Sequence, residues 1–418
     1  MRFSKPVLAP LCEAAAEVLR LDRPADAVLS AYFRSNPKLG QQDRALVAET
    51  IFAILRRKRL LEHLLPGAPV REVVLASWSL LLGANSRELE GMASTSVLEA
   101  IERAKQQASL PLPLAVECDL PDWLVERLLP RLGEDALRAV ARGLLQSAPL
   151  DLRVNSIKGS REPVRAALSE AGIEAALTPY APSGLRVKGK PAINRHPLFR
   201  DGTIEVQDEG SQILCLLLAA RRGEMVADFC AGAGGKTLSL GAVMRSSGRL
   251  YAFDISDVRL SKLRERVARS GLSNVQVQRI ENERDVRLSR LAGKLDRVLV
   301  DAPCSGLGTL RRNPDLKWRQ TPASVDEMRS KQRDILAAAA RLVKPGGRLV
   351  YATCSLLDEE NREIVEGFLA SNAAFTVRSA AEILSDQHVP LDTGEYLELL
   401  PHVHGTDGFF AAVLEREG

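Results

Sequence analysis

Several features that would define a narrow class of proteins are missing from this 418-residue sequence. No apolar run approaches the roughly 18 residues that a membrane-spanning helix needs, so no membrane association is expected. The sequence has no internal repeat and no low-complexity tract. The first six residues carry charge but no apolar segment follows them, so a secretory signal is not expected and the cytoplasm is the expected location.

Cysteine is scarce and scattered. The six cysteines form no C-x-x-C pair, which argues against a disulfide framework and against a zinc site, so no metal is predicted. The 57 basic residues outnumber the 53 acidic ones by a net charge of only +4. So small a net charge does not by itself indicate a nucleic-acid partner, and local clusters of basic residues must be considered instead.

The chain length predicts two or three domains, and the apolar pattern separates three regions. Residues 1–145 place apolar side chains at helical spacing, as in residues 45–55, with glycine and proline at the joints. This pattern predicts an all-helical domain. The basic run of residues 56–59 closes one of its helices, and it either complements the helix dipole or contacts phosphate groups.

The spacing of the apolar residues changes from helical to strand-like alternation at about residue 150. Strand-like segments and one helix within residues 146–204 predict a small α+β module. From residue 205 to 418 strands and helices alternate, which predicts an α/β fold with a parallel, doubly wound sheet. The strands expected there cover residues 225–229, 250–254, 275–277, 298–300 and 349–353, and a helix is expected over residues 324–343.

A glycine-rich turn joins the first of these strands to a helix. Glycines in residues 228–236 let a ligand approach the backbone, and the N-terminus of the following helix favours negative charge. The spacing before Lys236 and Thr237 does not match a Walker phosphate loop. Asp254 falls at the end of the second strand, the place for an acid that binds ribose hydroxyls. Together these features predict an adenosine-containing ligand, either NAD or S-adenosylmethionine.

Two cysteines follow strands directly. Residues 298–300 lead into Asp301 and then Cys304, and residues 349–353 lead into Cys354. In open α/β sheets, ligands and catalytic groups collect at the carboxyl ends of the strands. Two thiols at two strand ends, one of them near an acid, predict nucleophilic chemistry. The other cysteines are interpreted as small packing residues, Cys230 in the glycine turn and Cys12, Cys118 and Cys215 elsewhere.

These motifs resemble those of a known family. The segments Asp301-Ala-Pro-Cys304-Ser-Gly and Thr353-Cys354-Ser355, with the upstream turn 228–236, are similar to RNA 5-methylcytosine methyltransferases of the RsmB/NOP (Sun) family. Residues 1–145 resemble the NusB-like RNA-binding domain of the family's bacterial small-subunit rRNA branch. Segments 311–318 and 405–410 resemble that branch too. The resemblance implies a Rossmann-like catalytic domain over residues 205–418, with S-adenosyl-L-methionine as the cofactor.

The resemblance also implies a mechanism. Cytosine C5 is too poor a nucleophile to take a methyl group unaided, and a thiolate that adds at C6 activates it. By resemblance Cys354 is this nucleophile, and Cys304 assists the loss of the C5 proton and the release of the product. Asp301 would form hydrogen bonds with the N3/N4 edge of the cytosine.

Residues with a binding role follow in the same way. The resemblance assigns the cofactor to Cys230, Ala231, Gly232, Ala233, Gly234, Gly235, Lys236, Asp254 and Asp301, with Asn282 or Glu281 in place of the family's usual aspartate near the adenine. The target base must be single-stranded or flipped out for a thiol to reach it. Four basic side chains after Cys304 are placed to contact phosphates, namely Arg311, Arg312, Lys317 and Arg319. Trp318 either stacks on a base or packs in a core.

The favoured substrate is small-subunit ribosomal RNA, by resemblance. The alternatives are the same chemistry on transfer RNA, or an RNA-binding assembly factor with a silent methyltransferase fold. Intact Asp301, Cys304 and Cys354 argue against a silent protein. An NAD oxidoreductase is disfavoured because no histidine or tyrosine is placed to handle a hydride. RNA is therefore the predicted partner of a monomeric, cytoplasmic enzyme.

Overall fold

The structure, a computed structural model, describes residues 3–418 and contains two compact units. The helical unit consists of residues 3–147 and the later segment Thr309–Pro322. The sheet unit consists of Ala148–Gly308 and Ala323–Gly418. Met1 and Arg2, which belong to the predicted helical domain, lie outside the described residues. Within residues 3–418, no helix is both long enough and apolar enough to cross a membrane.

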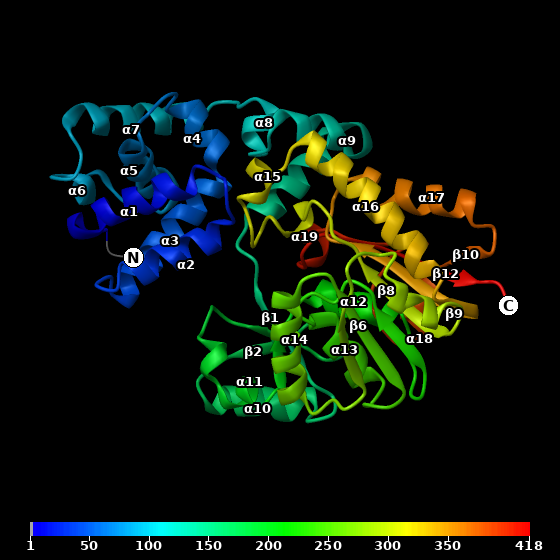
Figure 1. Ribbon diagram of the computed structural model, residues 1–418. Helices are drawn as coiled ribbons and strands as arrows, with labels where there is room; N and C mark the ends of the chain where they lie inside the picture. Colours follow the sequence, from blue (N-terminus) through cyan, green and yellow to red (C-terminus); the bar gives the residue numbers. More distant parts are fainter. Residues whose placement is uncertain (1–2) are drawn as a thin grey trace. The chain divides into compact units, whose positions relative to one another are not determined.

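The helical unit confirms the all-helical prediction for its part of the chain (Figure 1). Its core includes Trp78, which is fully buried and donates its indole N–H to the Thr50 hydroxyl at 2.9 Å. Its longest helix turns sharply at Gly133, where φ is 72°. The helices are α1 (Lys5–Val18), α2 (Ala25–Ser35), α3 (Gln41–Arg56), α4 (Lys58–Leu64), α5 (Val70–Leu81), α6 (Ser86–Leu89), α7 (Thr95–Ala108), α8 (Leu114–Glu117), α9 (Asp122–Leu145) and α15 (Leu316–Arg319).

The segment Thr309–Pro322 packs with the helical unit, although the sequence placed it in the catalytic region of residues 205–418. The Trp318 indole N–H donates to the Leu55 carbonyl at 2.7 Å. The Lys317 ammonium donates to the Arg56 carbonyl at 2.9 Å. Trp318 therefore packs against protein, which decides between its two predicted roles.

The basic run of residues 56–59 spans the end of α3 and the start of α4. Its side chains contact the helical unit itself: Arg56 donates to the Arg311 carbonyl at 3.3 Å, and Arg57 pairs with Asp119 at 3.3 Å. Arg59 forms an ion pair with Asp122 at 2.5 Å. The run thus ties segments of the unit together, which neither of the two sequence interpretations anticipated.

The sheet unit begins with a small antiparallel sheet in the order β2-β3-β1-β4. Its core lies between this sheet and α10, with Leu152, Leu168 and Leu185 fully buried. The predicted α+β character is confirmed, and β4 is a strand that the sequence analysis missed. The elements are β1 (Leu150–Val154), α10 (Arg161–Glu170), β2 (Ala175–Leu177), β3 (Gly184–Val187), α11 (Pro197–Arg200) and β4 (Ile204–Val206).

The main sheet has the order β10-β12-β9-β8-β5-β6-β7, with β11 beside β12. The pairs from β9 through β7 are parallel, as predicted. β12 runs antiparallel to β9, which the sequence analysis did not foresee. The strands are β5 (Met225–Asp228), β6 (Arg249–Asp254), β7 (Val275–Arg279), β8 (Leu295–Asp301), β9 (Val343–Thr353), β10 (Phe375–Arg378), β11 (Leu397–Leu399) and β12 (Phe409–Arg416).

Helices cover both faces of this sheet, as a doubly wound fold requires. Along β8, Val298 and Val300 join the core under α16 and α17, whereas Leu299 joins the core under α12 and α13. All three side chains are fully buried. The helices are α12 (Glu209–Leu217), α13 (Gly235–Val243), α14 (Asp257–Ser270), α16 (Pro322–Ala340), α17 (Arg362–Ser371), α18 (Ala380–Asp386) and α19 (Pro401–His404).

Candidate active site

A cavity of about 710 Å³ lies at the carboxyl ends of β5, β6, β8 and β9. Its volume falls within the range of about 300–1,000 Å³ that is usual for cofactor sites. Of the residues predicted to form the site, those that line it are Cys230, Ala231, Gly232, Ala233, Gly235, Lys236, Asp254, Glu281, Asn282, Asp301, Cys304 and Cys354. The structure thus brings together nearly all of the predicted catalytic and cofactor residues.

The glycine turn is shaped by Gly234 and Asp254. Gly234 has a φ of 88°, and a Cβ there would come within 2.1 Å of Leu263, so only glycine fits. The carboxylate of Asp254 accepts a hydrogen bond from the Gly232 amide at 2.9 Å and pairs with Arg259 at 3.1 Å. Asp254 therefore fixes the backbone of the turn at the cavity wall.

Lys236 and Asp301 form an ion pair of 2.6 Å inside the cavity. Lys236 is the second residue of α13, and Asp301 ends β8. Burial alone would lower the pKa of Lys236, but the charge and the hydrogen bond of Asp301 outweigh burial and raise this pKa above its ordinary value. Lys236 is therefore a fixed positive charge in the site.

The two predicted catalytic thiols are neighbours. The Sγ atoms of Cys304 and Cys354 lie 3.4 Å apart, and both cysteines are free. The hydrogen bond with Cys354 and burial raise the pKa of Cys304 well above its ordinary value, and the nearby carboxylate of Glu360 adds to the effect. The raised pKa keeps Cys304 in its thiol form beside Cys354. Cys230 packs against the core as predicted, and it also lines the cavity.

Several lining residues were missed by sequence reasoning. Asp228 is buried, accepts a hydrogen bond from the Thr237 hydroxyl at 2.6 Å and has its pKa raised to about 7 by burial. It ends a strand, as Asp254 does, and that signal could have identified it. The other missed residues are Ser211, Phe229, Ile255, Arg259, Ile280, Glu283, Ala302, Pro303, Met328, Lys331 and Ile335, most of which carry no distinctive chemical signal.

Glu281 and Asn282, the alternative adenine contacts, both reach the cavity. The side-chain oxygen of Asn282 accepts a hydrogen bond from the Arg284 amide at 2.8 Å. The Glu281 amide donates to Asp285 at 2.8 Å. These bonds fix the loop after β7, so that both side chains stand at the cavity wall.

The four basic residues predicted to contact RNA differ in their exposure. Arg311 is 6% exposed and Lys317 is 3% exposed, and both lie in the segment that packs with the helical unit. Burial lowers the pKa of Lys317 to about 7. These findings argue against phosphate contacts by Arg311 and Lys317. Arg312 and Arg319 are only half-buried, and Arg319 pairs with Asp315 at 3.3 Å.

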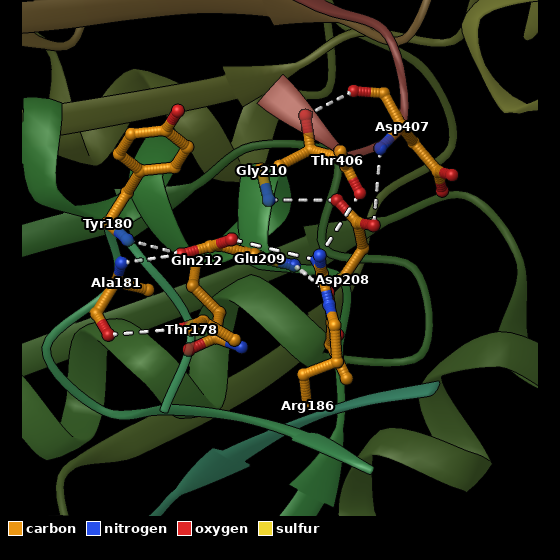
Figure 2. A network of polar contacts seen from close by, with 12 residues as sticks. Thr178, Tyr180, Ala181, Arg186, Asp208, Glu209, Gly210, Gln212, Thr406 and Asp407 are labelled. Carbon is orange, nitrogen blue, oxygen red and sulfur yellow. Dashed lines mark hydrogen bonds and ion pairs between the residues drawn. The ribbon is translucent and has the colours of Figure 1, made fainter. Parts of the chain in front are cut away.

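A polar network beside α12 connects the small sheet with the C-terminal segment (Figure 2). Glu209 accepts hydrogen bonds from the amides of Tyr180 and Ala181, at 2.6 and 2.8 Å. Its neighbour Asp208 accepts from the Asp407 amide at 3.2 Å. Segment 405–410, noted in the sequence for its resemblance alone, is thereby anchored next to the sheet.

This anchored segment reaches the cysteine loops through backbone hydrogen bonds. The Gly408 amide donates to the Gly308 carbonyl, and the Gly308 amide donates to the Cys354 carbonyl, each at 2.8 Å. A Cβ on Gly308 would come within 2.2 Å of the Gly408 carbonyl oxygen, so the two glycines allow this close approach. The C-terminal segment is therefore linked through Gly308 to the backbone of Cys354.

The geometry has counterparts among known proteins. A family model described as 16S rRNA methyltransferase RsmB/F matches residues 215–415, and one for the RsmF/B-like ferredoxin-like domain matches residues 120–194. The probable ribosomal RNA small subunit methyltransferase B of Synechocystis sp. is 31% identical, over 96% of this chain and 97% of that protein. The chain belongs to the RsmB/F methyltransferase family. The predicted RsmB/NOP resemblance is confirmed.

Other members and solved structures agree with this family assignment. The corresponding Bacillus subtilis protein is 28% identical, over 94% of this chain and 95% of its own length. The crystal structure of PH0851 matches with a TM-score of 0.79 and 27% identity over 100% of both chains. A methyltransferase homolog from Pyrococcus horikoshii matches with a TM-score of 0.62 and 28% identity, over 72% of this chain and 97% of that one. The predicted Rossmann-like methyltransferase fold is confirmed.

The cavity fits the cofactor of an RsmB/F methyltransferase, S-adenosyl-L-methionine. This molecule carries a sulfonium and an ammonium against one carboxylate, so its net charge is positive. Acidic side chains accordingly outnumber basic ones in the cavity lining. One oxygen of the buried Asp228 has no hydrogen-bond partner within the described chain and can accept from a cationic ligand. Asp254 at the end of β6 stands where ribose hydroxyls bind in such sheets.

Proposed function

We propose that this RsmB/F family member methylates C5 of a cytosine in small-subunit ribosomal RNA through a covalent bond between Cys354 and C6 of the base. The observation that carries the proposal is the 3.4 Å pair of thiols in the cavity, beside the ion pair of Lys236 and Asp301. The names of the curated relatives, which describe small-subunit rRNA methyltransferases, support the choice of substrate.

The first step is addition of the Cys354 thiolate to C6. A bond forms between Sγ and C6, and the electrons of the C5–C6 double bond make C5 nucleophilic. The bound cofactor supplies an electrophilic methyl group on a sulfonium. C5 then takes this methyl, and the electrons of the broken S–CH₃ bond stay on the departing sulfur. In this scheme Cys304 is the donor of the 3.4 Å contact between the two sulfur atoms, and Cys354 is the acceptor.

The second cysteine completes the reaction. Once Cys354 is bonded to C6 it can no longer carry a negative charge, and the main cause of the raised pKa of Cys304 disappears. Cys304 then releases its proton to solvent, and its thiolate accepts the C5 proton. The electrons of the C5–H bond restore the C5–C6 double bond, and Cys354 leaves as a thiolate.

Asp301 and Lys236 hold the base in this scheme. Oδ2 of Asp301 accepts from Lys236. Its other oxygen is assigned in this scheme to accept from the N4 amino group of cytosine. The fixed positive charge of Lys236 stabilises the negative charge that develops in the ring after thiolate addition. The target nucleotide has to be flipped out or single-stranded to enter the cavity.

RNA contacts outside the cavity are assigned to Arg312 and Arg319, the two half-buried members of the predicted basic group. Their side chains carry permanent positive charge and suit phosphate groups. A cytoplasmic location and a monomeric state remain predictions from the sequence.

The test combines labelled S-adenosylmethionine with unmodified small-subunit rRNA, and the modified nucleoside is identified after digestion. The wild type should yield 5-methylcytidine, and Cys354→Ala should yield none. Cys12→Ala is the matched control, because Cys12 belongs to the helical unit and does not line the cavity. Full methylation by Cys354→Ala would refute the nucleophile assignment.

Parallel reactions decide between the alternatives. Methylation of transfer RNA but not of rRNA would support the tRNA alternative. Retained binding of rRNA without methylation of any RNA would support a silent assembly factor.

A further inference from the structure

A buried carboxylate behind the cavity joins the two cysteine loops. Glu360 is fully buried, and it ends a short turn, Asp358–Glu360, just before α17. Its Oε1 accepts from the Ser305 amide at 2.8 Å. Its Oε2 accepts from the Ser305 hydroxyl at 2.5 Å and from the Ser355 hydroxyl. Ser305 directly follows Cys304 and Ser355 directly follows Cys354, so one side chain holds both loops at the residue next to the thiol.

Neighbouring residues complete this link. The two serine hydroxyls lie 3.1 Å apart. Gln332 of α16 donates from one amide nitrogen to Glu360 at 3.0 Å and to the Pro303 carbonyl at 2.9 Å. Asn361 donates to the Ser355 carbonyl at 3.1 Å. A carboxylate only accepts hydrogen bonds, and the donors around Glu360 suit an acceptor with two oxygens.

We propose that Glu360 is a positioning residue that sets the spacing of the Cys304 and Cys354 thiols by holding Ser305 and Ser355. The proposal rests on the two-cysteine reaction described above. Glu360 does not line the cavity, so it acts through the serines and not on the substrate. A displacement of about 1 Å in a reacting group can slow a reaction about 10²-fold. Glu360 links the two loops through their side chains, in addition to the backbone bond from Gly308 to Cys354.

The decisive variant is Glu360→Gln. Its amide keeps one acceptor oxygen, but its NH₂ group cannot accept from the two serine hydroxyls. In a single-turnover reaction of the full-length enzyme, we expect formation of the covalent RNA adduct to slow by about 10- to 100-fold, with unchanged affinity for S-adenosylmethionine. Glu359→Gln is the matched control and should form the adduct at the wild-type rate. Adduct formation by Glu360→Gln at the wild-type rate would overturn the proposal.

A second readout separates positioning from a general structural role. The titratable groups that interact with Cys304 include Cys354, Glu360 and Tyr351. Because the charge of Glu360 contributes to the raised pKa of Cys304, Glu360→Gln should move the pH profile of product release to lower pH. Glu360→Asp keeps the negative charge but shortens the side chain. It should therefore slow adduct formation and leave the pH profile of product release unchanged. Identical profiles for the two variants would count against the assignment.

The serines provide a test that spares the carboxylate. Ser305→Ala with Ser355→Ala removes both hydroxyl links, so adduct formation should slow as it does in Glu360→Gln. Adding the serine changes to Glu360→Gln should then have little further effect, because residues that act as one unit are not additive. Additive losses would show that the serines and Glu360 act separately. If the wild type itself forms no adduct, the proposed function fails, whatever the Glu360 variants do.

Discussion

Two lysines in helices of this protein, Lys236 in α13 and Lys317 in α15, have surroundings that shift their pKa values in opposite directions. Lys236 in the sheet unit lies 2.6 Å from Asp301, and its pKa is raised. Lys317 in the helical unit donates to a backbone carbonyl, and burial lowers its pKa to about 7. A carboxylate in direct contact keeps the first lysine charged, whereas the second loses its charge readily. Lys236 is a positive charge in the cavity, and Lys317 is a packing element of the helical unit.

The same contrast separates the two regions as a whole. Polar groups in the cavity point toward space that a ligand can fill, as Asp228, Asp301 and Cys354 do. Polar groups in the segment Thr309–Pro322 form hydrogen bonds with the helical unit. Substitutions in the cavity should therefore change the reaction and leave the fold intact. Substitutions of buried residues in this segment should change stability and leave the reaction intact.

After Cys354→Ala, the largest effect on the cavity side is expected from Cys304→Ala. Attack by Cys354 survives in this variant, but release is impaired, so a covalent RNA adduct should accumulate on denaturing gels. Turnover should fall by about 10²- to 10⁴-fold, the usual contribution of a positioned acid–base group. Cys354→Ala should form no adduct. Free RNA and normal turnover with Cys304→Ala would contradict the role given to Cys304.

The lysines themselves give the next test, as Lys236→Met against Lys317→Met. Lys236→Met removes the positive charge beside Asp301, so kcat should fall by about 10²- to 10³-fold, as when one electrostatic donor is lost from an active site. Lys317→Met should retain kcat, because Lys317 does not line the cavity. Circular dichroism checks that both variants are folded. Equal losses of kcat in the two variants would contradict the different roles given to Lys236 and Lys317.

The sequence was informative where a short segment carries both the strand and the group at its end. Asp301, Cys304 and Cys354 each follow an apolar strand, and the structure brings all three to one cavity. The sequence could not pair Lys236 with Asp301, because the contact joins two separate strand–loop units. It also missed the link through Glu360, since an acid in a run of acids looks like a solvated turn.

Other features depend on packing that no local pattern reveals. Lys317 and Arg311 look like exposed basic residues in sequence, and contacts within the helical unit, such as the bond from Lys317 to the Arg56 carbonyl, bury them. The antiparallel direction of β12 was missed for a related reason. Its apolar run reads the same in either direction, and the pairing with β9 decides the orientation.

A third prediction concerns stability and pH. The pKa of Lys317 is about 7 in the folded protein and ordinarily 10.5, so between these values the unfolded chain holds a proton that the folded chain lacks. Between these two pKa values, Lys317 therefore makes the free energy of unfolding rise with pH, by up to about 1.4 kcal/mol per pH unit. Lys317→Met should remove this rise. Cys118 has its pKa raised by burial to about 11 from 9.0 and acts in the opposite sense at higher pH, so pH 7 to 8.5 is the useful range.

Tryptophan fluorescence during denaturant unfolding measures this effect in the full-length protein. The three tryptophans, Trp78, Trp123 and Trp318, all belong to the helical unit. The signal therefore reports on that unit. An unchanged pH slope in Lys317→Met would show that Lys317 keeps its ordinary pKa, and Lys236→Met would then be the only lysine variant with a distinct phenotype.

The smallest expected effect concerns RNA affinity. Arg312→Gln removes a charge from a half-buried side chain in the segment that was predicted to contact phosphates. One lost phosphate contact should weaken binding of single-stranded rRNA a few-fold and reduce the slope of log K against log salt by about 0.7. Lys317→Met is the control, and its slope should match the wild type because the side chain is 3% exposed. If Lys317→Met reduced the slope and Arg312→Gln did not, the buried lysine would be a nucleic-acid contact, and the distinction drawn between the two lysines would fail.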